Sequence, residues 1–376
     1  MNRPRAASSR ACSDGRVALV TSLATPQLRL DVERLHSNIQ TMDAWCAARS
    51  VELAPHIKTT MSRQIVAAQL AAGARGVTVA TADQAALAVD WGAREVLVAN
   101  TVVDEASLRR LAALPATVRL FVDSIEGVAR AAEHSLGVLL DVGTAHNGRG
   151  GVRTLEEALS VAAAVVSAPA LRLEGVAGYE GVVPNDRAAW LDRVDEHAAL
   201  VRTVFFALLD VFETDSPIFS LGGSAYPDAA VAAMPTAEEV PAIVRLLRSG
   251  CYVTHDHGTY AGVSPIDGLL PALSVRTLVT SLPEPGLAVL NAGKRDLPYD
   301  AGLPVVLTGP VDATIRQLYD HHAVLVGPLG DLRVGDTVDL GLSHPCSAFD
   351  RWPRFVVTDG AGVDVDVWET DFRRVL

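Results

Sequence analysis

The chain has 376 residues, of which 49% are hydrophobic and 20% are charged. This apolar fraction is enough for a full core and excludes a disordered or low-complexity protein, while the length indicates two domains or one barrel with an appendage. The 32 basic and 44 acidic residues give a formal net charge of −12. A surface this acidic repels phosphate backbones and argues against a nucleic-acid partner.

The N-terminal segment and the cysteines bear on location. Residues 1–24 are rich in Arg and Ser and lack the long apolar core of a signal peptide, so we expect a disordered tail. No apolar run approaches the ~18 residues that a membrane helix requires. Four scattered cysteines form no CxxC pattern, which favours reduced thiols in the cytoplasm: Cys12, Cys46, Cys251 and Cys346.

Short apolar runs alternate with amphipathic stretches between Val51 and Val253. About seven helical patterns separate eight candidate strands, which over ~200 residues predicts a (β/α)8 barrel. A doubly wound sheet is the alternative, but no GxGxxG follows the first strand. The candidate strands are Val51–Ile57, Gly76–Ala80, Glu95–Ala99, Val118–Asp123, Gly137–Val142, Leu171–Tyr179, Ile218–Gly222 and Leu246–Val253.

The pattern changes after Ser264. Helical periodicity largely stops, and apolar runs alternate with Gly, Pro and Asp, which predicts an all-β domain over residues 264–376. The barrel then covers residues 25–263. Within it, Leu28–Asp31 has the alternation of a strand, so residues 25–31 are candidates for pairing with the β domain.

Lysine is rare in this chain. Only Lys58 and Lys294 stand among the 32 basic residues, and all others are arginines. Because arginine does not supply a nucleophilic amine and lysine does, a lysine that persists against such a bias is a candidate for chemistry. Lys58 follows the first predicted barrel strand and so belongs to the C-terminal mouth, where barrel active sites lie. A structural or surface lysine is the alternative.

Two segments with glycine follow or overlap the last two predicted barrel strands. They are Gly222-Gly223-Ser224 and Gly250-Cys251-Tyr252. Barrels often bind phosphate with the backbone N–H groups of these loops, although two ordinary tight turns would look the same. A lysine at one strand end and a phosphate cup across the mouth suggest pyridoxal phosphate.

His344 and Cys346 form an H-x-C pattern in the predicted β domain. On an extended segment, both side chains point to the same face. Imidazole and thiolate are suitable ligands for Zn²⁺. A buried histidine beside a buried cysteine is the structural alternative.

These segments together resemble the D-serine dehydratase and D-threonine aldolase family of pyridoxal-phosphate enzymes, which has the alanine-racemase-like fold. The resemblance extends from about Thr25 to Trp368 and is most specific in three stretches: Pro55–Thr59, Gln69–Ala80 and Ser343–Trp352.

The resemblance implies roles for the residues singled out above. Lys58 would hold and serve pyridoxal phosphate, Tyr179 would lie near its ring, and the two glycine segments would bind its phosphate. His56 and Arg149 are further cofactor-binding candidates, although Arg149 follows Asp141 by more residues than in the family. His344 and Cys346 match the family's metal pair.

The resemblance also implies a reaction. H-x-C with zinc is similar to the D-serine dehydratase branch, whereas the D-threonine aldolase branch more often has H-x-D with Mn²⁺ or Mg²⁺. We therefore expect a zinc-dependent dehydratase that converts D-serine or another D-β-hydroxy amino acid to a 2-keto acid and ammonia.

Three alternatives stay open. The first is retro-aldol cleavage to glycine and an aldehyde. The second is an amino acid racemase with Tyr260 or Tyr299 as its second base. The third is a non-catalytic pyridoxal-phosphate carrier, which the β domain argues against. The resemblance further implies a homodimer.

Overall fold

The computed structural model describes residues 24–144, 149–180 and 187–372. These residues form two compact units. The barrel unit contains the described residues of 38–253, residues 259–269 and Phe372. The sheet unit contains residues 24–37, 254–258 and 270–371. Residues 1–23 of the predicted tail lie outside the described residues.

The barrel unit is built on eight parallel strands in the order β2-β9-β8-β7-β6-β5-β4-β3. The two ends of this order meet through a parallel bridge between His56 and Thr78, and the Thr78 N–H donates to the Pro55 carbonyl at 2.9 Å. The predicted (β/α)8 barrel is therefore confirmed. The strands are β2 Glu52–Leu53, β3 Val77–Val79, β4 Glu95–Thr101, β5 Thr117–Val122, β6 Leu136–Val142, β7 Leu171–Gly178, β8 Ile218–Ser220 and β9 Val244–Leu247.

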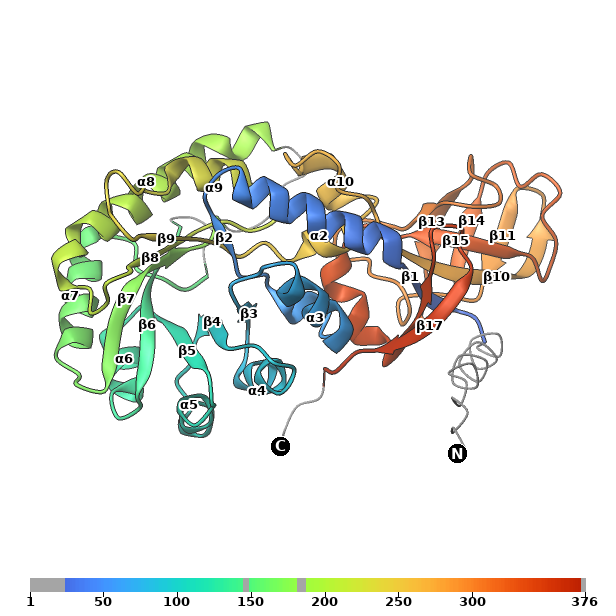
Figure 1. Ribbon diagram of the computed structural model, residues 1–376. Helices are drawn as coiled ribbons and strands as arrows, with labels where there is room; N and C mark the ends of the chain where they lie inside the picture. The colour runs from blue at the N-terminus through green and yellow to red at the C-terminus, as the bar shows by residue number, and fades with distance from the viewer. Residues whose placement is uncertain (1–23, 145–148, 181–186, 373–376) are drawn as a thin grey trace, which may run out of the picture. The chain divides into compact units, whose positions relative to one another are not determined.

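Helices lie around the outside of these strands (Figure 1). Side-chain caps fix several starts: the Asp104 carboxylate accepts from the Ser107 N–H, and Thr154 forms a capping box with Glu157. In the described part of the chain, no helix combines the length and the apolarity needed to cross a membrane. The helices are α2 Val32–Ala47, α3 Arg63–Ala71, α4 Ala82–Asp90, α5 Glu105–Ala112, α6 Ile125–Ala131, α7 Leu155–Val166, α8 Leu191–Ala207, α9 Pro227–Ala233 and α10 Thr259–Val263.

Apolar side chains from almost every strand fill the barrel interior. They pack into one buried cluster, so the barrel is a solid core and not a pore. Because apolar side chains fill the interior, polar side chains collect at the strand ends. The cluster consists of Ala54, Leu97, Phe121, Leu139, Ala177, Ile218, Val244 and Leu246.

The sheet unit contains a nine-stranded sheet with the main order β13-β14-β11-β10-β1-β16-β17, and β15 pairs with both β10 and β12. β1 (Gln27–Asp31) pairs antiparallel with β10 and parallel with β16. The first strand of the chain thus lies inside the C-terminal sheet. The other strands are β10 Leu273–Glu284, β11 Leu287–Leu290, β12 Val305–Val306, β13 Thr314–Leu318, β14 Ala323–Val326, β15 Thr337–Gly341, β16 Arg354–Thr358 and β17 Asp364–Glu369.

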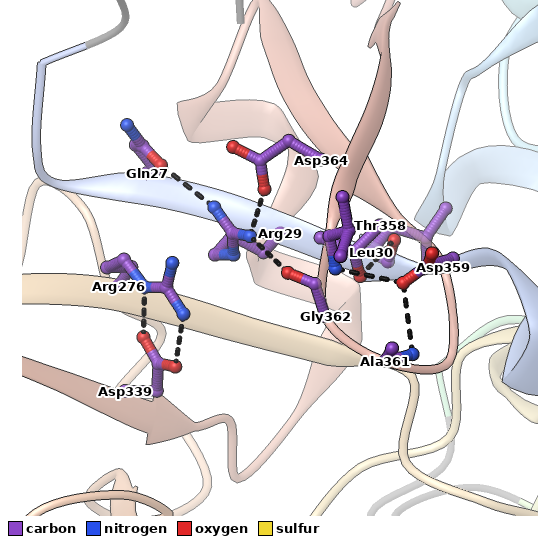
Figure 2. Close-up of polar contacts among 11 residues, drawn as sticks. Gln27, Arg29, Leu30, Arg276, Asp339, Thr358, Asp359, Ala361, Gly362 and Asp364 are labelled. Atoms are coloured by element: carbon purple, nitrogen blue, oxygen red, sulfur yellow. Dashed lines mark hydrogen bonds and ion pairs between the residues drawn. The ribbon is translucent and has the colours of Figure 1, made fainter. Parts of the chain in front are cut away.

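A buried arginine fixes β1 in this sheet (Figure 2). Arg29 is 4% exposed; it forms an ion pair with Asp364 of β17 and donates to the Gly362 carbonyl at 3.3 Å. On the neighbouring strands, Arg276 of β10 binds both carboxylate oxygens of Asp339 of β15, at 2.8 and 2.9 Å. On both sides of β1, ion pairs between strands therefore stabilise the sheet in addition to the backbone hydrogen bonds.

Candidate active site

Lys58 lies in a short 3-10 helix, η1 (Ile57–Thr59), that begins shortly after β2. The predicted strand over Val51–Ile57 is thus shorter than expected, because the chain turns at the barrel mouth. Ile57 and Thr59 are buried while Lys58 is half-buried. The neighbours anchor the segment, and the lysine side chain keeps access to solvent.

The two glycine segments lie side by side at the ends of β8 and β9. The Ser249 hydroxyl donates to the Gly223 carbonyl at 2.5 Å, and the Cys251 N–H donates to the Ser224 hydroxyl oxygen at 3.2 Å. The Cys251 sulfur lies 3.9 Å from the hydroxyl of Thr59, the residue after Lys58. The structure therefore brings both segments and the lysine segment together at one end of the barrel.

Glycine is required at these turns by close neighbours. A Cβ on Gly223 would lie 2.7 Å from the Tyr179 ring carbon Cε2. A Cβ on Gly250 would lie 2.3 Å from the His56 carbonyl oxygen, and Gly222 has a φ of +99°, which L side chains rarely adopt. The turns are thus packed against the other candidate site residues.

Tyr252 points away from this mouth. Its hydroxyl accepts a hydrogen bond from Gln69 Nε2 of α3 at 3.0 Å, and the ring is buried. Burial raises the pKa of this hydroxyl. Tyr252 can therefore contribute its backbone to the phosphate cup, while its side chain supports the turn from behind.

Tyr179 and Arg149 are in contact. Tyr179 directly follows β7, and the guanidinium carbon of Arg149 lies 5.2 Å from the centre of its ring. This distance is typical of a cation–π contact. Most of the enlarged loop that precedes Arg149, residues 145–148, lies outside the described residues, but Arg149 itself reaches the candidate site.

Arg248, which our sequence analysis did not single out, is a buried cation at this end of the barrel. Its Nη2 donates to the Gly178 carbonyl at 2.6 Å, and its Nη1 donates to the Ser220 hydroxyl oxygen. Its guanidinium carbon lies 5.3 Å from the centre of the Phe121 ring. A charged residue that ends an apolar strand at a barrel mouth is the signal that could have identified it.

Buried ionisable groups surround Arg248. Burial raises the pKa of Asp141 to about 6, while Arg248 opposes the shift. Burial, together with the charges of Lys58 and Arg248, keeps the pKa of His56 well below its usual value. The mouth therefore holds a neutral imidazole among cations, which is a suitable setting for an anionic ligand.

A carboxyl group of the protein's own already lies at the Gly223 turn. The Glu180 oxygen Oε1 accepts from the Gly223 N–H at 2.5 Å, and its other oxygen is buried and makes no hydrogen bond. Burial raises the pKa of this carboxyl. Backbone N–H groups that bind a carboxylate oxygen also suit a phosphate oxygen, so the residues present fit pyridoxal phosphate, with Lys58 as its anchor.

The candidate metal pair lies after β15 in the sheet unit. His344 precedes the short 3-10 helix η5 (Pro345–Ser347), and Cys346 is a side-chain hydrogen-bond partner of His344. His344 Nδ1 lies 2.7 Å from Asp300 Oδ2. Burial lowers the pKa of His344, but Cys346 and Asp300 outweigh it and raise the pKa to about 9.

This donor set suits a divalent cation with an open coordination sphere. Imidazole and thiolate would be two direct ligands, and a carboxylate on the distal imidazole nitrogen is the usual support of a metal-bound histidine. Among the described residues, no group of three or more His, Cys, Asp or Glu side chains is placed to bind one ion. Water or a ligand would complete the coordination.

The two tyrosines considered for a racemase differ in exposure. Tyr260, in α10, is buried at 6% exposure, and Tyr299 is 48% exposed. The Lys294 amine lies 5.6 Å from the centre of the Tyr299 ring. Lys294 belongs to the sheet unit and lies beside this exposed tyrosine, whereas Lys58 lies at the barrel mouth.

Two family models match the chain. The model "Alanine racemase, N-terminal domain" matches residues 30–247 and covers the barrel strands. The model "Putative serine dehydratase domain" matches residues 272–358, which include His344 and Cys346.

Curated and solved relatives agree with these matches. The chain is 29% identical over 348 residues to the 3-hydroxy-D-aspartate aldolase of Paracoccus denitrificans (strain Pd 1222). This alignment covers 86% of each of the two chains. The solved D-threonine aldolase from Filomicrobium marinum matches with a TM-score of 0.81 and 28% identity, over 92% of this chain and 94% of that one.

A dehydratase is also similar. Over 78 residues, 21% of this chain and 20% of that protein, the chain is 40% identical to the D-threo-3-hydroxyaspartate dehydratase of Delftia sp. (strain HT23). A mutant of this dehydratase, solved in the metal-free form, shares the fold with a TM-score of 0.75 at 21% identity, over 94% of this chain and 99% of that one. The resemblance noted from the motifs around Lys58 and His344 is confirmed: the chain belongs to the alanine racemase N-terminal domain family, and its relatives include D-threonine aldolase and 3-hydroxy-D-aspartate aldolase.

Proposed function

We propose that the protein is a pyridoxal-phosphate-dependent lyase that cleaves a D-β-hydroxy amino acid to glycine and an aldehyde. The observation that carries the proposal is the meeting of the Lys58 segment with the two glycine turns at one end of the barrel. Cleavage is favoured over our expected dehydration because the relatives that align over most of the chain at 28–29% identity are aldolases, whereas the dehydratase aligns over 94% of the chain at only 21% identity.

Each residue of the mouth has a defined task in this proposal. The N–H groups of Gly223 and Cys251 and the hydroxyl of Ser224 would hold the phosphate, and Glu180 would give up the Gly223 N–H to it. Lys58 would anchor the cofactor through its amine.

The chemistry divides between the cofactor and Lys58. When bound, pyridoxal phosphate withdraws electrons from the bond that breaks at Cα. The Lys58 amine, released when the substrate amino group takes its place, is available to move a proton at Cα. In cleavage the β-hydroxyl gives up its proton, the Cα–Cβ bond breaks to form the aldehyde, and the ammonium form of Lys58 would deliver a proton to Cα. In dehydration the Lys58 amine would remove the Cα proton as hydroxide leaves Cβ.

Dehydration to a 2-keto acid and ammonia is the second candidate, and the His344–Cys346 pair favours it. A thiolate ligand selects a soft divalent cation such as Zn²⁺ over Mn²⁺ or Mg²⁺. A metal ion acts as a Lewis acid on oxygen and makes hydroxide a better leaving group. The serine dehydratase domain match over residues 272–358 supports the same candidate.

The products distinguish the two reactions. The purified protein, loaded with pyridoxal phosphate, is incubated with D-threonine, 3-hydroxy-D-aspartate or D-serine, and the L enantiomers serve as controls. We expect glycine and an aldehyde, whereas a 2-keto acid with ammonia would establish the dehydratase. Interconversion of enantiomers without either product would indicate a racemase.

The metal requirement is tested in the same assay. EDTA should abolish turnover, and re-addition of Zn²⁺ should restore it if the pair of His344 and Cys346 serves the reaction. Activity that survives EDTA would contradict a metal-dependent reaction and leave the cofactor assignment in place.

A further inference from the structure

Asp300 lies against His344 in the sheet unit, and no motif in the sequence pointed to it. Its Oδ2 oxygen is 2.7 Å from His344 Nδ1. Its Oδ1 oxygen accepts a hydrogen bond from the Ser347 hydroxyl at 2.7 Å. Both carboxylate oxygens are therefore engaged by residues that flank Cys346.

The segment that carries Asp300 is fixed in place from a second side. The Ser343 hydroxyl donates to the Gly302 carbonyl at 2.7 Å, so a residue just after Asp300 is tied to the residue just before His344. The His344 side chain is 20% exposed, whereas the Asp300 side chain is 49% exposed. The Asp300 carboxylate is therefore held in place by its hydrogen bonds to His344 and Ser347 and not by burial.

The contact with Asp300 favours one tautomer of the His344 imidazole. A carboxylate at Nδ1 accepts a hydrogen bond from the Nδ1–H group, so the proton of the neutral ring stays on Nδ1 and the lone pair that can bind a metal is on Nε2. We propose that Asp300, fixed by Ser347, is a positioning residue that holds His344 beside Cys346 in the tautomer and orientation that bind a divalent cation through Nε2. This inference rests on the proposed function, because it takes His344 and Cys346 as the metal ligands.

Metal affinity of the full-length chain tests the inference. The wild type is stripped with a chelator and titrated with Zn²⁺ in competition with a chromophoric chelator. Asp300→Asn should weaken Zn²⁺ binding by about 10- to 100-fold, as loss of a carboxylate behind a metal-bound histidine usually does. Ser347→Ala, which removes a contact of the carboxylate and leaves the carboxylate itself, should weaken binding less.

The chain provides a matched control. The Asp350 side chain is also 49% exposed and lies in the same unit, but it pairs with Arg351. Asp350→Asn should therefore bind Zn²⁺ as the wild type does. The double variant Asp300→Asn/Ser347→Ala should lose as much Zn²⁺ affinity as Asp300→Asn alone, since Ser347 acts through Asp300.

Spectroscopy with Co²⁺ separates positioning from direct ligation. At saturating Co²⁺, Asp300→Asn should keep the ligand-field bands and the thiolate charge-transfer band of the wild type. Changed bands would show that Asp300 is itself a ligand, and unchanged Zn²⁺ affinity would show that it does nothing for the metal; either result overturns the inference. A wild type that binds no metal would overturn the metal pair and this inference together, while the product assay would still decide the lyase reaction.

Discussion

Asp141, near the end of β6, carries a carboxyl group whose ionisation the barrel opposes. Burial raises its pKa to about 6, although Arg248 favours the charged form. Between about pH 4 and pH 6, the folded protein therefore keeps a proton that the unfolded chain has released. The free energy of unfolding falls as the pH rises through this window, because the unfolded state binds fewer protons.

Replacement of Asp141 by Asn removes this titration. Relative to the variant, the wild type should lose about 3 kcal/mol of unfolding free energy between pH 4 and pH 7, since about two pKa units at about 1.4 kcal/mol each are involved. Urea unfolding of both proteins at several pH values measures the difference. The difference should be constant above pH 7, and a difference that is constant from pH 4 upward would contradict the prediction.

Sequence reasoning identified residues by type and missed those defined by contacts. Lys58 and the glycine segments were predicted because lysine is rare here and glycine follows two apolar runs. Glu180 and Asp300 were not, because their roles come from contacts with Gly223 and His344, which lie far away in the sequence. Such contacts are visible only once the strands and turns are placed.

At the scale of elements, β1 depends on one buried ion pair for its place in the sheet. Arg29 contacts β17 and the turn before it, and few other charged side chains of the sheet unit are as buried (Figure 2). Removal of one partner leaves the other charge without its counter-ion in a partly dry site.

Arg29→Ala should therefore lower the free energy of unfolding by about 3 kcal/mol. Arg34 is the control: it pairs with Asp31 at 3.1 Å, but its side chain is 50% exposed. Arg34→Ala should cost at most about 1 kcal/mol. Equal losses in chemical unfolding of the two variants would show that burial does not set the strength of the Arg29 pair.

The turn that carries Gly250 sets the position of the Lys58 segment. A Cβ there meets the His56 carbonyl oxygen at 2.3 Å, and a backbone atom cannot rotate away. Gly250→Ala should lower the lyase activity by about 100-fold, as expected when a catalytic group is displaced by about 1 Å.

Two matched variants complete this experiment. Gly223→Ala meets the side chain of Tyr179, which can move, so its effect should be smaller than that of Gly250→Ala. A Cβ on Gly262 in α10 has no atom within 4 Å, so Gly262→Ala should leave the activity unchanged. A Gly250→Ala variant as active as Gly262→Ala would refute the packing argument.

Buried parallel strands were the elements easiest to predict. They are nearly continuous apolar runs, and each of the eight predicted strands between Val51 and Val253 overlaps a strand of the barrel, although the last, Leu246–Val253, shares only Leu246 and Leu247 with β9. β13 was missed because only two of its five residues, Ile315 and Leu318, are buried.

At the scale of the whole molecule, the chain has only two lysines, so mass spectrometry can identify which of them binds the cofactor. Borohydride reduction with pyridoxal phosphate present should add one cofactor to the chain, in the peptide between Arg49 and Arg63 that contains Lys58. Lys294, beside Tyr299, is the internal control and should stay unmodified. Attachment at Lys294, or at neither lysine, would contradict the proposed anchor.

The homodimer stays a prediction of the resemblance. Light scattering of the purified protein should give twice the chain mass of 39.6 kDa. A measured mass equal to that of a single chain would contradict the homodimer and would not affect the family assignment.

The pairing of β1 with β16 has a consequence for how the chain folds as it is synthesised. The strand made first can complete its place in the sheet only when the strand of residues 354–358, close to the C-terminus, has left the ribosome. The barrel strands lie between them in the chain, so the barrel can form earlier while β1 waits with open backbone edges. A ribosome that stalls before it reaches β16 would therefore release a chain with a finished barrel and a β1 strand that can pair with β10 on one side but keeps an open edge on the other, a form prone to associate with its copies.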